Sequence, residues 1–395
     1  DADLLWTHDA RASDDLSTLY TQAQASLDLT QGPLLRALLV TLDDGSQRLL
    51  LVVHHLVVDG VSWRILLEDL QAAYRQAPLP LKTHAYQRWA ERLQDYAPTA
   101  LTQIDYWCAQ LPDAPDLPGA DPHASLQGRH ARIAHSRLDA ALTQQLLQQA
   151  PAAYRTQVND LLLTALARVI CRWTGHPDTL IQLEGHGREE LFDDIDLSRT
   201  VGWFTSLFPL RLTPAESLAA SLKRVKEQLR GVPHKGIGFG LLQGHSALRG
   251  RVMPRITFNY LGQFDGSFAE AEGALFVPAG ERAGAEQSSE APLDNWLSIE
   301  GQVYDGELDL RWTFSTKMFD AASIEQLAAD YTGELQALIR HCCQPESMGV
   351  TPSDLPLAGL DQGRLDAITV PASEIEDLYP LSPMQQGMLF HSLYE

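Results

Sequence analysis

Apolar segments with helical spacing alternate with short apolar segments typical of strands, and this alternation constrains the fold more than any other feature. The clearest pair is a strongly apolar helix predicted over 158–173, closed by Gly175, and a strand predicted over 179–183. Nearer the N-terminus, a strand over 34–42 precedes the continuous apolar run 49–53, which is suited to a strand buried on both faces. Strands and helices that alternate in this way predict an α/β fold.

The composition indicates a globular protein and argues against several classes of partner. The chain has 395 residues, of which 45% are hydrophobic and 21% are charged, so it is long enough for two or more domains. Fifty-one Asp and Glu residues against 30 Lys and Arg residues give a net charge of −21. This charge argues against nucleic acid or an anionic membrane surface as the main partner.

The cysteines and the apolar segments favour a cytoplasmic location. Four cysteines in a chain of 395 residues, with no C-x-x-C pair, do not indicate a disulfide framework. The N-terminal segment has neither the basic nor the apolar region of a signal peptide. The longest apolar stretch, at 49–58, covers about ten residues and is too short to span a bilayer. The four cysteines are Cys108, Cys171, Cys342 and Cys343.

Two turn-rich segments divide the chain. Residues 112–128 contain four prolines and two glycines and are predicted to be a linker, and the interval 345–371 is predicted to be a second one. Between them lies a second α/β region. Its further strands are predicted over 132–138, 256–260, 296–303 and 307–314, and its further helices over 140–149 and 323–341.

The segment HHLVVDGVSW, residues 54–63, places two adjacent histidines after an apolar run. If the strand continues through them, His54 and His55 point to opposite faces and cannot serve the same site. Asp59 is placed to cap a helix that begins near Gly60. Imidazole suits proton transfer near neutral pH, but histidines also occur as structural core residues, so both interpretations stay open. A metal site is less supported, because the spacing matches no zinc pattern.

Glu184 ends a predicted apolar strand and is followed at once by a glycine. A carboxylate in this position is either a solvated strand terminus or a partly desolvated acid/base group with a raised pKa. Both alternatives stay open from position alone. Nearby residues are interpreted more simply, as local ion-pair partners (His186, Arg188 and Glu189) or as core aromatic residues (Trp203, Phe204 and Phe208).

Two later segments are candidates for ligand sites. HKGIGFGLL, residues 234–242, is rich in glycine but matches no nucleotide-binding fingerprint. The strand predicted over 256–260 contains two polar residues, Asn259 and Tyr260. A buried asparagine needs hydrogen-bond partners, which either the backbone or a ligand supplies.

Six segments, taken in order, resemble the motif series of epimerization domains from nonribosomal peptide synthetases, which belong to the condensation-domain superfamily. The pattern HHxxxDG alone indicates only the superfamily, whereas EGHGRE together with VGWFTS and FNYLGQ indicates epimerization. The resemblance covers residues 1–345, and the family's opening segment lies upstream of Asp1. The six segments are HHLVVDGVSW, VNDLLLTALARV, EGHGRE, RTVGWFTSLFPL, GIGFGLL and FNYLGQ.

The resemblance implies an α/β fold of two lobes like that of chloramphenicol acetyltransferase, V-shaped and with a central tunnel. Residues 1–118 are then the incomplete N-terminal lobe, residues 129–345 the C-terminal lobe and residues 346–375 a linker. Residues 376–395 resemble the first motif of a following condensation domain. The chain is therefore expected to be an excerpt of a longer synthetase.

The reaction implied by the resemblance is L-to-D inversion at Cα of an aminoacyl or peptidyl thioester. The substrate is presented on the 4'-phosphopantetheine arm of an upstream peptidyl carrier protein, and no cofactor or metal is bound directly. A downstream condensation domain in the same polypeptide is the second partner; nucleic acid and membrane are not expected. Removal of a proton from one face and its return to the other needs two acid/base groups. His55 and Glu184 are the implied pair, and which of them abstracts the proton stays open.

The intermediate of such a reaction is enolate-like and needs hydrogen-bond donors at the thioester oxygen. Asn259, Tyr260 and the backbone near Gly60 are the candidates for this role. The residues implied to support the site are His54, Asp59 and Trp203. Two alternatives remain: a condensation domain that forms peptide bonds, and a non-catalytic module that docks carrier proteins.

Overall fold

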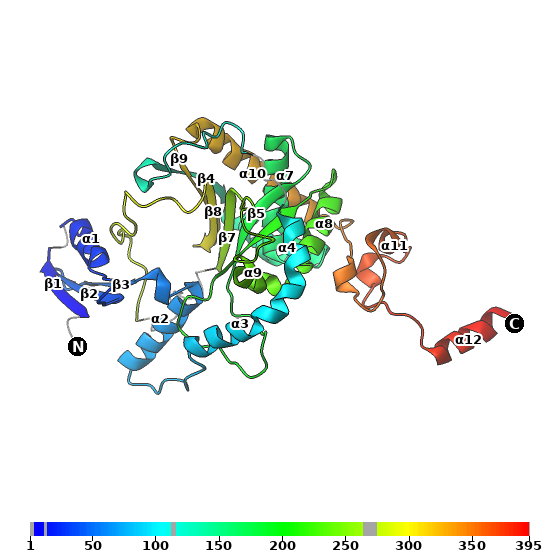
Figure 1. Ribbon diagram of the computed structural model, residues 1–395, viewed down its shortest axis with the longest axis horizontal. Coiled ribbons are helices and arrows are strands. Elements are labelled where there is room, and N and C mark those ends of the chain that lie inside the picture. Colours follow the sequence, from blue (N-terminus) through cyan, green and yellow to red (C-terminus); the bar gives the residue numbers. More distant parts are fainter. Residues whose placement is uncertain (1–3, 12–13, 112–115, 264–274, 395) are drawn as a thin grey trace.

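The computed structural model describes residues 4–11, 14–111, 116–263 and 275–394. The strands in these ranges form two separate sheets, one of three strands and one of six, which lie in different parts of the molecule (Figure 1). Each sheet has its own cluster of buried apolar side chains. Two sheets with separate cores and helices packed on them confirm the predicted two-lobed α/β fold.

The small lobe is a three-stranded sheet with one helix packed on it. β1 runs parallel to β2, and β2 and β3 form an antiparallel hairpin. The predicted burial of 49–53 on both faces is wrong, since Leu49 is 39% exposed. The reason is that β3 is the edge strand of a small sheet, and α1 covers one face of it. The bounds are β1 Leu5–Ala10, α1 Ser17–Ala25, β2 Leu35–Leu42 and β3 Gln47–Val53.

Three helices lead from the small lobe to the large one, and the last of them packs into the large core. Trp107 in α4 is fully buried there, together with Leu111 and Leu117. The chain therefore enters the large core already before residue 112, and Leu117, inside the segment 112–128 predicted to be a linker, also packs there. Residues 112–115 of that segment lie outside the described residues. The bounds are α2 Gly60–Tyr74, α3 Tyr86–Ala100 and α4 Ile104–Gln110.

The large lobe is built on a mixed sheet with the strand order β4-β9-β8-β7-β5-β6. β7 is parallel to both of its neighbours, and the other neighbouring pairs are antiparallel. α7 and α10 pack against each other beside this sheet (Figure 1). The bounds are β4 Ala131–Leu138, α5 Ala140–Gln148, α6 Ala150–Ala153, α7 Val158–Thr174, β5 Thr179–Gly185, β6 Ser206–Leu212, α8 Leu218–Arg230, α9 Ile237–Leu242, β7 Ile256–Gln263, β8 Leu297–Tyr304, β9 Glu307–Ser315 and α10 Ala321–Cys342.

The predicted elements of the large lobe are confirmed to within a few residues. α7 and β5 match the helix predicted over 158–173 and the strand predicted over 179–183. Gly175 closes α7 in the left-handed conformation, with a φ of 71°, which glycine adopts without steric cost. α7 is apolar on almost every side because it is enclosed by the sheet, α8 and α10.

Residues 275–296, which precede β8, lie beside the small lobe and then lead into the large sheet (Figure 1). Arg48 of β3 pairs with Glu281 of this segment, with 2.7 Å between Nε and Oε1. The side-chain nitrogen of Gln24 donates a hydrogen bond to the carbonyl oxygen of Ala283 at 3.0 Å. At Gly284 the φ is +85°, and an added Cβ would lie 2.7 Å from the backbone nitrogen of Thr21. The close approach of the two backbones therefore requires glycine.

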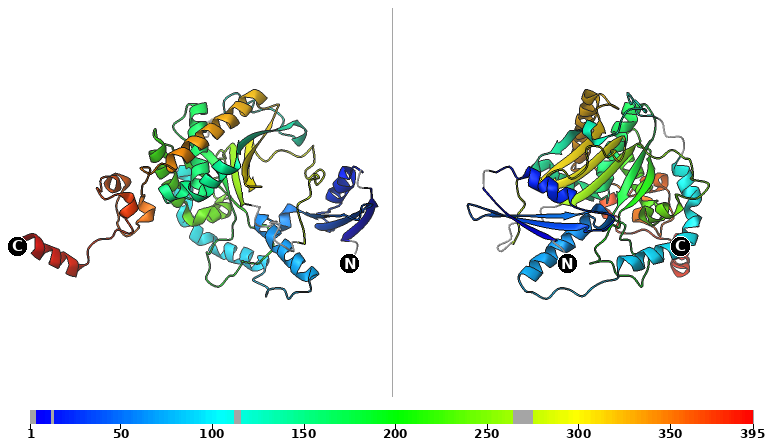
Figure 2. Two further views of the ribbon diagram at one scale, coloured as in Figure 1. Left: turned by 180° about the vertical axis from the view of Figure 1, so that it is seen from behind. Right: turned by 60° about the vertical axis from the view of Figure 1, so that its left-hand side comes forward.

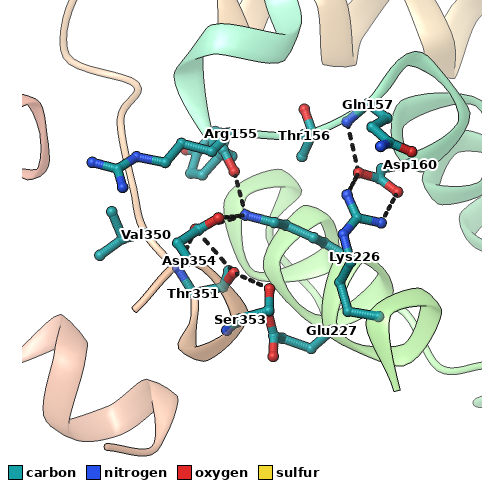
Figure 3. A network of polar contacts seen from close by, with 12 residues as sticks. Arg155, Thr156, Gln157, Asp160, Lys226, Glu227, Val350, Thr351, Ser353 and Asp354 are labelled. Atoms are coloured by element: carbon teal, nitrogen blue, oxygen red, sulfur yellow. Dashed lines mark hydrogen bonds and ion pairs between the residues drawn. The ribbon is translucent and has the colours of Figure 1, made fainter. Parts of the chain in front are cut away.

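Residues 346–378 form a small folded segment that is attached to α8. Lys226 of α8, with 1% of its side chain exposed, contacts both carboxylate oxygens of Asp354 at 2.6 Å (Figure 3). The same nitrogen donates to the carbonyl oxygen of Tyr154 at 2.9 Å. The segment contains α11, Gln362–Asp366, and a core of Val350, Leu355 and Leu365. Its assignment as a linker over 346–375 stays a prediction.

The last helix, α12 (Pro383–Tyr394), extends away from the rest of the molecule, at the end opposite the small lobe (Figure 2). It carries exposed apolar side chains, among them Met384, Met388 and Leu393. Within the described ranges, none of the helices combines the length and the hydropathy needed to cross a membrane.

Candidate active site

The loop that carries the two histidines follows directly after β3. The strand ends at Val53, and His55 begins a short 3-10 helix, His55–Val57, so the assumption that both histidines lie on the strand is wrong. The Nδ1 atom of His54 accepts a hydrogen bond from the backbone N–H of Leu56 at 3.2 Å and so fixes the loop. His55 is exposed, and its ring meets the ring of Trp203 edge to face, with 5.2 Å between the ring centroids.

Asp59 connects this loop to the large lobe. Its side chain is 6% exposed, and Oδ1 accepts from the backbone N–H of Ser62 at 2.7 Å, which caps α2 as predicted. Arg188 donates to Oδ1 and Oδ2 of the same carboxylate at 3.0 and 3.1 Å. The backbone N–H of Phe204 donates to Oδ2 at 3.1 Å. One buried carboxylate therefore orients the start of α2 and two segments of the other lobe.

Arg188 is not the local ion-pair partner that the sequence suggested. Its partner Asp59 lies 129 positions earlier in the chain, directly before α2. The guanidinium also donates to Ser62 Oγ at 2.9 Å and lies 4.0 Å from the centre of the Phe204 ring. Local pairing is confirmed for the other two residues of that group, because His186 Nε2 lies 3.2 Å from Glu189 Oε1.

Trp203 is not a core residue, since it is 37% exposed, whereas the predicted burial of Phe204 and Phe208 is confirmed. The main chain around Trp203 is held from the starts of α2 and α3. Ser62 Oγ donates to the carbonyl oxygen of Gly202 at 2.9 Å, and the hydroxyl of Tyr86 donates to that of Trp203 at 2.8 Å. These bonds leave the indole outside the core, beside the ring of His55.

Glu184 lies near the end of β5 and is partly buried. The side-chain nitrogen of Asn259, on the adjacent parallel strand β7, donates to Glu184 Oε2 at 2.5 Å. Burial, followed by the negative charges of Glu300 and Asp294, raises the pKa of Glu184 to about 7, and His55 acts in the opposite direction. Of the two alternatives left open, the partly desolvated carboxyl group is therefore the one that the structure favours.

Tyr260 follows Asn259 on β7 and is also partly buried. Burial raises the pKa of its hydroxyl to about 12, so the group keeps its proton and can donate a hydrogen bond at neutral pH. The strand is irregular immediately after this residue, because its pairing with β8 shifts between Tyr260 and Gln263.

A cavity of about 860 Å³ connects these groups. Glu184, Asn259 and Tyr260 line it from the large sheet, and Asp59 and Gly60 line it from the start of α2. The lining residues thus come from the large sheet and from the start of α2. His54, His55 and Trp203 do not line it; His55 is nevertheless close enough to Glu184 to influence its pKa.

The sequence did not single out Ser62 or a long-range role for Arg188. The only signal for Arg188 was its position within EGHGRE, which does not reveal a partner in the other lobe. Among the described residues, no group of three or more histidine, cysteine, aspartate or glutamate side chains is arranged to hold a metal ion.

Comparison with known proteins shows that the chain belongs to the condensation-domain family. The profile of the condensation-domain family matches residues 5–356. The chain is 43% identical to a polypeptide of the linear gramicidin synthase of Brevibacillus parabrevis, over 100% of this chain and 8% of that polypeptide. It is 40% identical to a polypeptide of the mycosubtilin synthase of Bacillus subtilis, over 96% of this chain and 15% of that polypeptide. The chain therefore spans a small part of these relatives.

Solved structures support the same placement. The epimerization domain from the third module of tyrocidine synthetase B is 36% identical, with a TM-score of 0.78, covering 87% of this chain and 80% of that one. The condensation domain from Monacolin K polyketide synthase has a TM-score of 0.64 at 16% identity, covering 88% and 81%, and shows the fold alone. These matches confirm the predicted two-lobed fold like that of chloramphenicol acetyltransferase.

Proposed function

Because the chain belongs to the condensation-domain family, we propose that it is an epimerization domain of a nonribosomal peptide synthetase. The proposed substrate is an aminoacyl or peptidyl thioester on the 4'-phosphopantetheine arm of a peptidyl carrier protein. The proposed reaction inverts L to D at Cα. The observation that carries this proposal is the partly buried carboxyl group of Glu184, held by Asn259 in a cavity lined by the large sheet and the start of α2.

The proposed mechanism uses two groups that each gain or lose one proton. One of His55 and Glu184 takes the Cα proton from one face, which leaves an enolate of the thioester. The other group gives a proton to the opposite face, and exchange with solvent resets both groups. Imidazole suits proton transfer, and burial brings the pKa of Glu184 to about 7, so both protonation states of this carboxyl group are accessible at neutral pH.

The enolate oxygen needs hydrogen-bond donors that are already in place. The hydroxyl of Tyr260 is supported for this role because it lines the cavity and keeps its proton at neutral pH. The backbone at Gly60 lies at the start of α2, where N–H groups have no partner within the helix. Asn259 is proposed instead to orient Glu184, since its amide already donates to that carboxylate.

His54, Asp59 and Trp203 are proposed to support the site. His54 fixes the loop through Leu56, and Asp59 joins that loop to Arg188 of the other lobe. Trp203 lies against the ring of His55 and limits its orientation. Loss of any of these contacts would displace His55 without removing an acid/base group.

The further assignments made from the resemblance remain part of this proposal. The N-terminal and C-terminal lobes span 1–118 and 129–345, a linker spans 346–375, and a following condensation domain begins within 376–395. The proposed partners are the upstream carrier protein and that downstream domain, in the cytoplasm. The substrate arm is attached to the carrier protein, so no cofactor is bound directly by this chain.

The family profile itself favours a second candidate, a condensation domain that forms a peptide bond. Peptide-bond formation needs an activated amine nucleophile, but it needs no second acid/base group on the opposite face of a carbon. Glu184 therefore favours epimerization. The presence of both His55 and Glu184 also argues against a non-catalytic docking module.

A product assay distinguishes these candidates. A holo carrier protein loaded with an L-aminoacyl group is incubated with the complete polypeptide that carries this chain, with and without a second loaded carrier as amine acceptor. Epimerization predicts a D-aminoacyl group without any acceptor, detected by chiral chromatography after thioester hydrolysis. A longer peptide that forms only with the acceptor would identify a condensation domain, and neither product would favour the docking module.

A further inference from the structure

One buried hydrogen-bond acceptor beside the cavity has no partner among the described residues. The chain contains three asparagines, and two of them are paired within the protein. Asn259 donates to Glu184, and the side chain of Asn295 both donates to Thr257 Oγ1 at 2.9 Å and accepts from the backbone N–H of Trp296 at 2.8 Å. The Oδ1 atom of Asn159 is buried and accepts no hydrogen bond from any described residue. Such an atom calls for a donor from outside the chain.

The groups around Asn159 are already paired with one another. On the first turn of α7, the backbone N–H of Gln157 donates to Asp160 Oδ2 at 2.7 Å (Figure 3). The carboxylate of Asp160, which is 1% exposed, also accepts two hydrogen bonds from Arg230, at 3.0 and 2.7 Å. Arg230, which lines the same cavity, is therefore held by Asp160.

Asn159 and Glu184 line the same cavity of about 860 Å³. Leu229 of α8, Val232 after it and Phe208 of β6 contribute apolar side chains to its lining. A ligand that fits this lining has a reactive carbon near Glu184, methylene groups along the apolar wall and an N–H group that reaches Asn159. The arm of a carrier protein has this composition, because two secondary amides are separated by methylene groups along its length.

We propose that Asn159 Oδ1 accepts a hydrogen bond from an amide N–H of the pantetheine arm and so positions the thioester beside Glu184. This inference rests on the proposed function. Asn159 is a positioning residue, because it contacts the arm and not the reacting carbon. Its loss weakens substrate binding and leaves the acid/base groups in place.

The test is a double-mutant cycle between the residue and the substrate. The enzyme variants are the wild type and Asn159→Leu, which has nearly the same shape and no acceptor. The substrates are an L-aminoacyl pantetheine thioester and two analogues in which one or the other amide N–H is replaced by an ester oxygen. Inversion is followed by deuterium incorporation at Cα in the complete polypeptide. For one of the analogues, the wild type should lose about 3- to 10-fold in kcat/KM, mainly through KM, as expected for a neutral hydrogen bond.

Asn159→Leu should show the same loss on the unmodified substrate, and no further loss on that analogue. Equal losses in the wild type and in the variant for both analogues would overturn the inference. If the variant does not fold, the wild type alone decides: unchanged kcat/KM on both analogues contradicts the hydrogen bond. Failure of the proposed function is distinguishable, because the wild type would then invert none of the three substrates.

Discussion

The carboxyl group of Glu184 lies at the end of β5, where burial withdraws it from water and Asn259 holds one of its oxygens. Its raised pKa, about 7, means that folding favours the protonated form of this residue. The usual pKa of a glutamate in the unfolded chain is 4.5. The contribution of Glu184 to stability is therefore fully present below pH 4.5 and is lost as the pH rises through about 7.

We predict that Glu184→Gln is more stable than the wild type at pH 8 and that the difference disappears near pH 5. Glutamine keeps the shape and cannot ionise, so the cost of the buried charge is removed. Since Glu184 is only partly buried, the expected difference in the free energy of unfolding is on the order of 2 kcal/mol. Urea unfolding at several pH values measures it. Glu307→Gln, at an exposed position of β9, is the control and should show no such trend. A constant difference in stability between Glu184→Gln and the wild type across this pH range would contradict the prediction.

Individual residues were predictable only where the chemistry is local. The cap formed by Asp59 follows from its position before a helix, and a raised pKa for Glu184 was one of two alternatives for a carboxylate at a strand end. The conformation of His54 and His55 was not predictable, because the strand stops at Val53 without a glycine or proline to mark its end. Hydrophobicity alone places Trp203 in the core, whereas its environment depends on Ser62 and Tyr86, more than a hundred positions away.

At the scale of elements, the ion pair between Asp59 and Arg188 links the start of α2 to the large lobe. Both side chains are almost fully buried, with 6% and 8% exposed, and one guanidinium nitrogen, Nη2, contacts both carboxylate oxygens. A buried pair of this kind is sensitive to the loss of one partner, because the remaining charge is left without compensation.

We predict that Arg188→Lys lowers the free energy of unfolding by about 3 kcal/mol and sharply reduces inversion. Lysine keeps the charge, but its single nitrogen cannot also reach the carbonyl oxygens of Leu197 and Thr200 that Arg188 Nη1 contacts, and it cannot lie flat on the Phe204 ring. Denaturant unfolding and the rate of D-product formation measure the two effects. Arg132→Lys is the matched control, since its pair with Glu325 is about half exposed and should contribute less than 1 kcal/mol. Equal stabilities of the two variants would refute this assignment.

The start of α9 provides a second comparison within a single element. Gly236 has a φ of +87°, and an added Cβ would lie 2.0 Å from the Phe208 ring, whereas nothing lies within 4 Å of a Cβ added at Gly240. We predict that Gly236→Ala destabilises the protein by about 2 kcal/mol or more. Gly240→Ala should be neutral or stabilising by up to about 1 kcal/mol, because alanine favours a helix. Thermal unfolding of both variants tests this, and a stable Gly236→Ala variant would contradict it.

Elements with uninterrupted patterns were predicted well, as α7, β5 and β9 show. β6 was not predicted, because it contains Pro209, which removes a hydrogen-bond donor. The strand tolerates this proline because it lies at the edge of the sheet and pairs only with β5. α3 was not predicted either; it contains Pro98 near its end.

At the scale of the whole molecule, long-range attachments hold separate parts of the chain together. The segment between β7 and β8 reaches the small lobe through Glu281, and residues 346–378 are attached to α8 through Asp354. The sequence indicates that such segments are turn-rich, but it does not say where they pack. The ion pair of Lys226 and Asp354 joins positions that are 128 residues apart.

We predict that Lys226→Met detaches residues 346–378 from α8 and leaves inversion within about twofold of the wild type. Methionine fills the space of the lysine stem but leaves the Asp354 carboxylate without its cation. Hydrogen exchange should accelerate by at least about tenfold across 349–366, since loss of 1.4 kcal/mol corresponds to a factor of ten. Lys223→Met removes a more exposed pair with Asp366 and should have a smaller effect. Unchanged exchange in Lys226→Met would show that other contacts hold the segment.

The most direct test of the account follows the Cα proton itself. A carrier protein loaded with an L-aminoacyl or peptidyl thioester is incubated in deuterated water with the complete polypeptide, and Cα deuterium and the D/L ratio of the released acyl group are measured. The wild type should incorporate deuterium at Cα and approach a D/L mixture, whereas His55→Ala and Glu184→Gln should each nearly abolish both while still binding the carrier. Retention of the Cα hydrogen by the wild type, or an unchanged D/L ratio in either variant, would contradict the proposed acid/base pair.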